Sequence, residues 1–227
     1  KDCLEANTTA NNNTGVGFEA LKANTTGSAN VAVGSISLDA NTEGQYNTAI
    51  GYESLSANTT ADENTALGSF ALRYNTTGGN NTAAGYKALE DNTTASNNTA
   101  FGFEALNANT TGTANVAVGG LALDACTTGD DNVAVGYNSL SSLTTGNSCI
   151  AMGRAALNAN TTGVANVAVG DQALESNSTA SNNSAFGHHA LVTNTTGYNN
   201  VACGNYALRY NTEGLENVAV GYNSLED

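Results

Sequence analysis

The chain lacks proline and tryptophan, and only 11% of its 227 residues are charged. Six Lys and Arg residues stand against 20 Asp and Glu, which gives a formal net charge of −14. Nucleic acids and anionic membrane surfaces are therefore poor partners, because proteins bind both through clustered positive charge. No apolar run approaches the roughly 18 residues of a transmembrane helix, and no signal peptide is recognisable. We predict neither nucleic-acid binding nor membrane insertion.

The residue patterns of known catalytic and metal sites are also missing. The sequence contains no Ser/His/Asp spacing, nucleotide-binding loop or EF-hand loop. Its only histidines, His188 and His189, stand at variable positions where exposed side chains are expected. The acidic pairs Asp62-Glu63 and Asp130-Asp131 leave a loose Ca²⁺ site open as an alternative to solvated loops. We predict a protein that is not an enzyme and has no catalytic residues, metal site or cofactor.

A strict period dominates the sequence. Gly stands at every multiple of 17 from Gly17 to Gly221, with no insertion or deletion, and Asn, Thr, Gly and Ala supply more than half of all residues. Periods of this length are typical of solenoids and repeat arrays. We number the repeat from this Gly, which is position 0. Thirteen repeats and six further residues make up the chain.

No linker or change of composition interrupts the period. We therefore predict one continuous solenoid over residues 1–227. Neither end shows the polar capping unit that protects the open edge of a free-standing solenoid. We expect further repeats, another chain or end-to-end stacking to cover the ends.

One column is uniformly apolar. Position 4 is Leu in every copy of the repeat, and such a column is expected to form the core. The predicted core ladder consists of Leu21, Leu38, Leu55, Leu72, Leu89, Leu106, Leu123, Leu140, Leu157, Leu174, Leu191 and Leu208.

Positions 13 to 16 read Asn-Val-Ala-Val or Asn-Thr-Ala-Ile in typical copies. Positions 14 and 16 would share one face and the small Ala at position 15 the other, which is the alternation of a β-strand. The Gly at position 0 would end the strand where a Cβ would clash or a positive φ is needed. Positions 1 to 6, as in residues 103–108, fit either a second short strand or a short helical turn. We predict a parallel β-solenoid of about 13 coils, with one strand per coil at positions 13–16.

Positions 7 to 10 read Asn-Thr-Thr-Gly and predict a turn, since Asn tolerates the left-handed region and Gly a positive φ. Asn-Thr-Thr also matches the acceptor pattern for N-linked glycans, so some of these sites carry sugar if the chain is secreted by a eukaryote; the alternative is that the turn itself requires Asn-Thr. Exposed position 12 offers further acceptor sites at Asn12, Asn80, Asn97 and Asn182. The candidate sites at position 7 are Asn7, Asn24, Asn58, Asn75, Asn92, Asn109, Asn160, Asn177 and Asn194.

A regular Thr column accompanies this turn at position 8. Such a ladder is a candidate surface for binding ice or carbohydrate, although plain turn chemistry explains the same residues. The candidate binding ladder consists of Thr8, Thr25, Thr42, Thr59, Thr76, Thr93, Thr110, Thr127, Thr144, Thr161, Thr195 and Thr212.

The four cysteines fall in four different columns and form no disulfide framework. Cys203 replaces an aliphatic residue at position 16, and we expect it to be buried. Cys126 and Cys149 lie on adjacent coils at different corners, so pairing between them stays open, and Cys3 could cross-link chains. The redox compartment is left undecided.

The strand motif resembles the head repeats of YadA-type trimeric autotransporter adhesins, in which similar coils stack into parallel β-rolls that trimerise. The resemblance is carried by residues 30–34 (NVAVG), 47–51 (NTAIG), 132–136 (NVAVG) and their equivalents. The full unit also resembles repeats in phage tail fibres and other large surface proteins. This chain departs from the adhesin repeats in its longer coil, its constant Leu and its Asn-Thr-Thr corner.

Together these features predict a non-enzymatic extracellular structural repeat, a stiff segment of a fibre, filament or adhesin shaft. The alternative is a solenoid that binds ice or carbohydrate through its Thr/Asn face. Self-association is the expected partnership, either end to end or as a homo-oligomer, with a cell-surface or glycan ligand as a further possibility. The expected location is extracellular or surface-exposed, on a cell, an appendage or a virion fibre.

Overall fold

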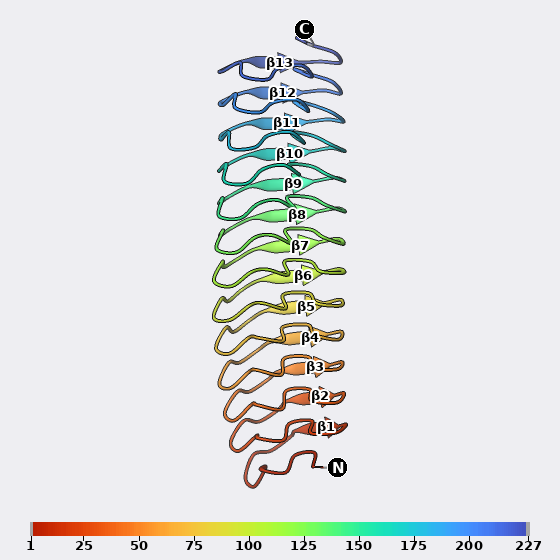
Figure 1. Ribbon diagram of the computed structural model, residues 1–227, viewed down its shortest axis with the longest axis vertical. Helices are drawn as coiled ribbons and strands as arrows, with labels where there is room; N and C mark the ends of the chain where they lie inside the picture. Colours follow the sequence, from red (N-terminus) through yellow and green to blue (C-terminus); the bar gives the residue numbers. More distant parts are fainter. Residues whose placement is uncertain (1, 226–227) are drawn as a thin grey trace. The chain divides into compact units, whose positions relative to one another are not determined.

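The computed structural model describes residues 2–225. The chain falls into two compact units, Lys1–Ala114 and Asn115–Asp227. In each unit the coils follow one another in sequence order, from red to yellow-green in the first and from green to blue in the second (Figure 1). No described helix is long and apolar enough to cross a membrane.

Every full coil contributes one three-residue strand, and within each unit consecutive strands pair in parallel. The register is one repeat long: Ala32 lies opposite Ala49, and Ala168 lies opposite Ala185. The predicted parallel β-solenoid is confirmed, with the strands one residue shorter than expected, at positions 14–16. The first unit holds β1 (Thr14–Val16), β2 (Val31–Val33), β3 (Thr48–Ile50), β4 (Thr65–Leu67), β5 (Thr82–Ala84) and β6 (Thr99–Phe101). The second holds β7 (Val116–Val118), β8 (Val133–Val135), β9 (Ile150–Met152), β10 (Val167–Val169), β11 (Ser184–Phe186), β12 (Val201–Cys203) and β13 (Val218–Val220).

The core of each unit contains three columns of buried small or apolar side chains, at positions 3, 4 and 15. Leu at position 4 is fully buried in nearly every coil, as at Leu38 and Leu157, and Ala at position 15 is buried beside it, as at Ala49. The small residues at positions 3 and 15 leave room for the larger Leu, so the three columns fill a narrow interior. The predicted Leu core is thus what the structure contains.

The segment from position 1 to position 6 is a series of turns, not the second strand or helical turn expected. Positions 2 and 4 both have positive φ, as in Ile36 (57°) and Leu38 (50°). The N–H of Ile36 donates back to Phe18 O (2.8 Å), whereas that of Leu38 donates forward to Ser54 O (3.0 Å). A helical turn would direct its N–H groups along its own axis and need about 8–10 Å between neighbours, too wide for stacked strands. Bonds to both neighbouring coils offset the left-handed backbone, which costs roughly 1–2 kcal/mol per residue.

The Gly at position 0 turns the chain out of the strand. Gly51 has a φ of 140°, and a Cβ there would lie 2.5 Å from the carbonyl oxygen of Gly68 in the next coil. Both reasons expected for Gly, a positive φ and a close approach of backbone, therefore apply.

Candidate interaction surface

The outward side of the strands is uncharged, with an apolar residue at position 16 of every strand and Thr, Val, Ile or Ser at position 14. Because Ala at position 15 points inward, the side chains at positions 14 and 16 point outward, and Ile50, Phe101 and Met152 are 42%, 44% and 43% exposed. No strand has a charged residue at either position. We call these side chains the outer face. In the first unit it comprises Thr14, Val16, Val31, Val33, Thr48, Ile50, Thr65, Leu67, Thr82, Ala84, Thr99 and Phe101. In the second it comprises Val116, Val118, Val133, Val135, Ile150, Met152, Val167, Val169, Ser184, Phe186, Val201, Cys203, Val218 and Val220.

In the first unit a row of aromatic rings follows the strands, at positions 1 and 2. Tyr52 meets Phe70 edge to face at 5.4 Å, Phe70 meets Tyr86 at 5.8 Å, and Tyr86 stacks on Phe103 at 5.7 Å between ring centroids. The guanidinium of Arg73 lies 4.9 Å from the centre of the Phe70 ring. Each ring pair adds about 0.5–1.5 kcal/mol beyond its buried area, so the row is an ordered ridge beside the outer face.

The expectation that Cys203 is buried is wrong. Cys203 is exposed and not buried, because position 16 faces outward. Cys126 and Cys149 are buried in the interior as free thiols, and Cys3 is a half-buried free thiol. Burial raises the pKa of Cys126 to about 11 and also raises the pKa of Cys149. The two interior thiols are therefore protonated and shielded near neutral pH.

Two columns of Asn form ladders inside each unit. At position 7, Asn41 donates from its amide to Asn24 Oδ1 (2.8 Å) and to the carbonyl of Gly44 in its own turn (3.0 Å). At position 13, the backbone N–H of Asn47 donates to Asn30 Oδ1 (2.9 Å), and its side-chain amide donates to Ala61 O (2.8 Å). The amides thus satisfy turn carbonyls that the strands leave unpaired.

This arrangement places the candidate glycosylation sites at position 7 inside the protein. A glycan on such an amide nitrogen would replace one of its two N–H donors and has no space in the folded coil, so the folded chain cannot carry sugar at the buried sites. The fully buried sites are Asn24, Asn58, Asn75, Asn92, Asn109, Asn160, Asn177 and Asn194, and Asn7 is half-buried. The acceptor sites at position 12, Asn12, Asn80, Asn97 and Asn182, are exposed.

The Thr ladder at position 8 is engaged in stacking. Thr42 Oγ1 donates to the carbonyl of Thr59 one coil later (3.1 Å), and Thr76 Oγ1 donates to that of Thr93 (3.0 Å). These hydroxyl protons are used within the protein, and most of the side chains are half-buried. In this turn, the fully exposed column is position 9, which includes Thr60.

The acidic pairs lie at loop positions. Asp62, Glu63 and Asp131 are exposed, and Asp62 Oδ1 accepts a hydrogen bond from the N–H of Gln45 (2.7 Å). Among residues 2–225, one group of three side chains has the spacing of metal ligands, and it includes neither acidic pair. It joins Asp171 to His188 and His189, which are half-buried and not fully exposed as expected.

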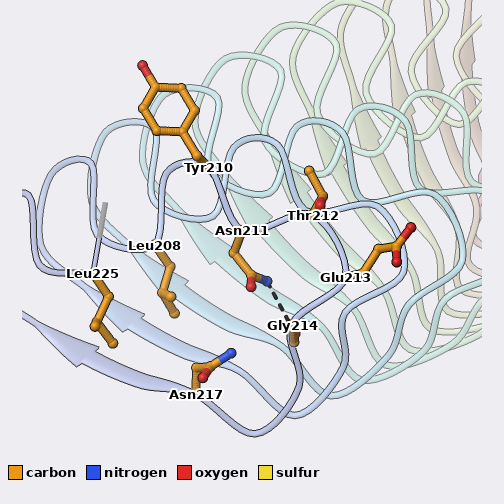
Figure 2. A pocket seen from close by; sticks show the side chains of 8 residues that line it. All are labelled: Leu208, Tyr210, Asn211, Thr212, Glu213, Gly214, Asn217 and Leu225. Carbon is orange, nitrogen blue, oxygen red and sulfur yellow. Dashed lines mark hydrogen bonds between the residues drawn. The ribbon is translucent and has the colours of Figure 1, made fainter. Parts of the chain in front are cut away.

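A cavity of about 330 Å³ opens at the last described coil. Leu208, Asn211 and Asn217, which belong to the interior columns, line it together with Leu225, and Asn211 donates to the carbonyl of Gly214 (3.2 Å) across its wall (Figure 2). The cavity is thus formed by the interior side chains of the last described coil. It is apolar on the Leu side and amide-lined on the Asn side.

Comparisons with protein-family models, curated proteins and solved structures found no match for this chain.

Proposed function

We propose that the chain is an extracellular structural repeat protein, a segment of a fibre, filament or adhesin shaft without enzymatic activity. The observation that carries the proposal is the continuous bonding between coils. Successive coils are joined through the strands, through the turn at positions 1–6, through the Thr corner and through two Asn columns. Bending a unit would stretch several of these bonds at every step, so each unit is expected to be stiff.

The outer face supports self-association, and a second copy of this chain is its proposed occupant. A net charge of −14 makes copies repel one another except where they meet through uncharged surface. The outer face has no charged position. Its apolar side chains at position 16 repeat at the strand spacing of about 4.8 Å, and an identical copy presents the same side chains at the same spacing. Such matched rows can interdigitate along the whole length of a unit.

The alternative, binding of ice or carbohydrate through the Thr/Asn face, has less support. The Asn side chains at positions 7 and 13 point inward, and the hydroxyl protons at position 8 are engaged in hydrogen bonds. This leaves mainly the position 9 column, in which Glu43 and Glu213 interrupt the Thr residues. Thermal hysteresis measurements and glycan arrays would detect the two activities.

The test is the assembly state of the full chain, by sedimentation and electron microscopy. We expect oligomers or filaments for the wild-type chain. Ile50→Glu places a charge on the outer face and should shift the association midpoint to at least about tenfold higher concentration, which corresponds to about 1.4 kcal/mol. Thr60→Glu adds the same charge at exposed position 9 and should leave association unchanged. A chain that stays monomeric at all concentrations, or equal effects of the two variants, would contradict the proposal.

A further inference from the structure

The only two histidines of the chain meet an aspartate on the neighbouring coil. Asp171 and His188 both occupy position 1, one repeat apart, so their side chains stack on adjacent coils. His188 Nε2 lies 3.7 Å from Asp171 Oδ2, and the backbone N–H of His189 donates to Asp171 O (3.0 Å). A hydrogen bond between the backbones therefore holds the coil of Asp171 against that of the histidines.

The backbone of the repeat also brings the two imidazoles together. Consecutive side chains of an extended chain point to opposite faces. His189 stands at position 2, where every coil has a positive φ, here 56°. The ring centroids of His188 and His189 are consequently 3.9 Å apart. The N–H of His188 donates to Asn205 Oδ1 (3.1 Å), and its carbonyl accepts from the N–H of Tyr206 (3.0 Å). The following coil thus holds the backbone of His188 through both its N–H and its carbonyl.

We propose that Asp171, His188 and His189 bind a divalent transition-metal ion, with Zn²⁺ as the reference case. One ligand atom from each residue lies within 4.8 Å of the other two. Zn²⁺ bonds of about 2.0–2.2 Å to nitrogen and oxygen bring ligand atoms somewhat closer than this, which small side-chain rotations achieve. Two imidazoles with one carboxylate favour Zn²⁺, Ni²⁺ or Cu²⁺ over Ca²⁺ and Mg²⁺, which prefer oxygen ligands. Water would complete the coordination because the three side chains are half-buried.

Other groups already contact this cluster. Arg154 lies 2.9 Å from Asp171 Oδ2, so a metal either binds the other carboxylate oxygen or displaces the guanidinium. The ring of Tyr206 packs against both imidazoles, at 5.2 and 5.5 Å between centroids. The ring limits the directions from which a ligand can approach. A bound metal ion would link the coil of Asp171 to the coil of His188 and His189 and would stabilise the stacking of these two coils.

The test is titration of the full chain with ZnCl₂ by calorimetry, in a Cys3→Ser/Cys203→Ser background that removes the two thiols outside the interior. We expect saturable binding of one ion per chain and a higher melting temperature. His188→Gln, His189→Gln and Asp171→Asn should each weaken binding at least about tenfold. Glu216→Gln, at an exposed position 12, is the matched control and should bind as the background does. MgCl₂ should give no saturable heat.

A second measurement covers variants that fold poorly. In the NMR spectrum of the unmutated chain, NiCl₂ should broaden the imidazole resonances of both histidines at substoichiometric amounts. Absence of saturable Zn²⁺ binding would overturn the proposal. So would binding that the His188→Gln/His189→Gln double variant leaves unchanged, or binding that the Cys3→Ser/Cys203→Ser background abolishes.

Discussion

Asn41 lies between the equivalent Asn residues of the two neighbouring coils: its amide donates to Asn24 Oδ1 at 2.8 Å, and its Oδ1 accepts from the amide of Asn58 at 2.9 Å. The three residues lie one repeat apart and are fully buried. Each Asn therefore acts as donor and acceptor in one continuous ladder, and its environment is polar because its neighbours are the same residue. A buried amide without such neighbours would lose both partners.

In the second unit the position 7 ladder is interrupted where other residues replace Asn. Cys126 and Leu143 occupy position 7 in two consecutive coils, and both are fully buried. Cys149, also buried, replaces the Asn at position 13 in the coil of Leu143. One repeat before Cys126, the buried Oδ1 of Asn109 has no hydrogen-bond partner among residues 2–225. Such an unpaired buried group costs about 1–3 kcal/mol, and replacing neighbouring members together confines this cost to the ends of the interruption.

Asn41→Ala is expected to lower the free energy of unfolding by about 2–4 kcal/mol, because in the interior Asn24 Oδ1 loses its donor and the amide of Asn58 loses an acceptor. Urea unfolding followed by circular dichroism measures the change. Thr60→Ala, at an exposed corner position, should stay within about 0.5 kcal/mol of wild type. Equal stability of the two variants would show that the ladder contributes nothing.

Gly51→Ala is expected to be more damaging than Gly79→Ala, although the chemical change is identical. At Gly51 the added Cβ would lie 2.5 Å from a backbone oxygen, and φ is 140°. At Gly79 the nearest atom is Asp62 O at 3.2 Å, and φ is not in the positive region. We expect losses of at least about 3 kcal/mol for Gly51→Ala and no more than about 1 kcal/mol for Gly79→Ala. Thermal and urea unfolding of the two variants would decide, and similar losses would contradict the close coil contact.

Asp39→Asn is expected to stabilise the protein at neutral pH and not at low pH. Burial raises the pKa of Asp39 to about 6, and its Oδ1 has no hydrogen-bond partner among residues 2–225. In the unfolded chain the Asp39 carboxyl has a pKa near 3.8. Between pH 3.8 and 6 this carboxyl therefore binds more protons in the folded state than in the unfolded state, and the protein loses stability as the pH rises. Above pH 6 the folded protein bears the full free-energy cost of burying the ionised Asp39 carboxylate. After allowance for solvent screening of this half-buried group, we expect a gain of about 1–2 kcal/mol at pH 7.5.

That gain should vanish below pH 3.8, where Asp39 is neutral in both states. Urea unfolding at pH 3.5 and pH 7.5 measures both limits. Glu63→Gln, an equivalent change at an exposed loop position, is the control and should leave the free energy of unfolding within about 0.5 kcal/mol of wild type. A gain for Asp39→Asn that is the same at both pH values would rule out the ionisation of this carboxyl as its cause.

Thiol reactivity should distinguish the outer face from the interior. At pH 8 in the native state, Cys203 should react quickly with a disulfide reagent because it is exposed. Cys126 and Cys149 should react only after unfolding, because burial shields them and raises their pKa. Peptide mass mapping after a short native pulse identifies the labelled sites, and Cys203→Ser should remove the fast reaction. Rapid native labelling of Cys126 would mean that the interior columns are open.

Much of the fold could be predicted because the same residue types recur at the same positions of every coil and must pack in the same way each time. A Leu in one column of every coil is informative where a single Leu is not, and the Leu core and the Gly bend are confirmed. Positions 1 to 6 could not be predicted, because Ile36 and Leu38 adopt a left-handed backbone that their side chains disfavour. Only the hydrogen bonds of neighbouring coils compensate for this conformation, and local propensity does not contain them.

The candidate surfaces were harder to predict for the same reason. The alternation of strand positions was readable, but which side faces solvent was not, so Cys203 was expected inside and lies outside. The Asn of the Asn-Thr-Thr corner has the pattern of an exposed glycan acceptor and becomes an interior ladder. The histidines, expected to point separately into solvent, meet Asp171 across a coil boundary.

By itself the sequence determined the length of the coil, the residue that bends it, the Leu column at its centre and the parallel register, because all four follow from a period that never slips. The tertiary structure decided the direction of each side chain and the partner of each polar group. These depend on backbone dihedrals that neighbouring coils impose on one another through hydrogen bonds. One repeat alone has no such neighbours.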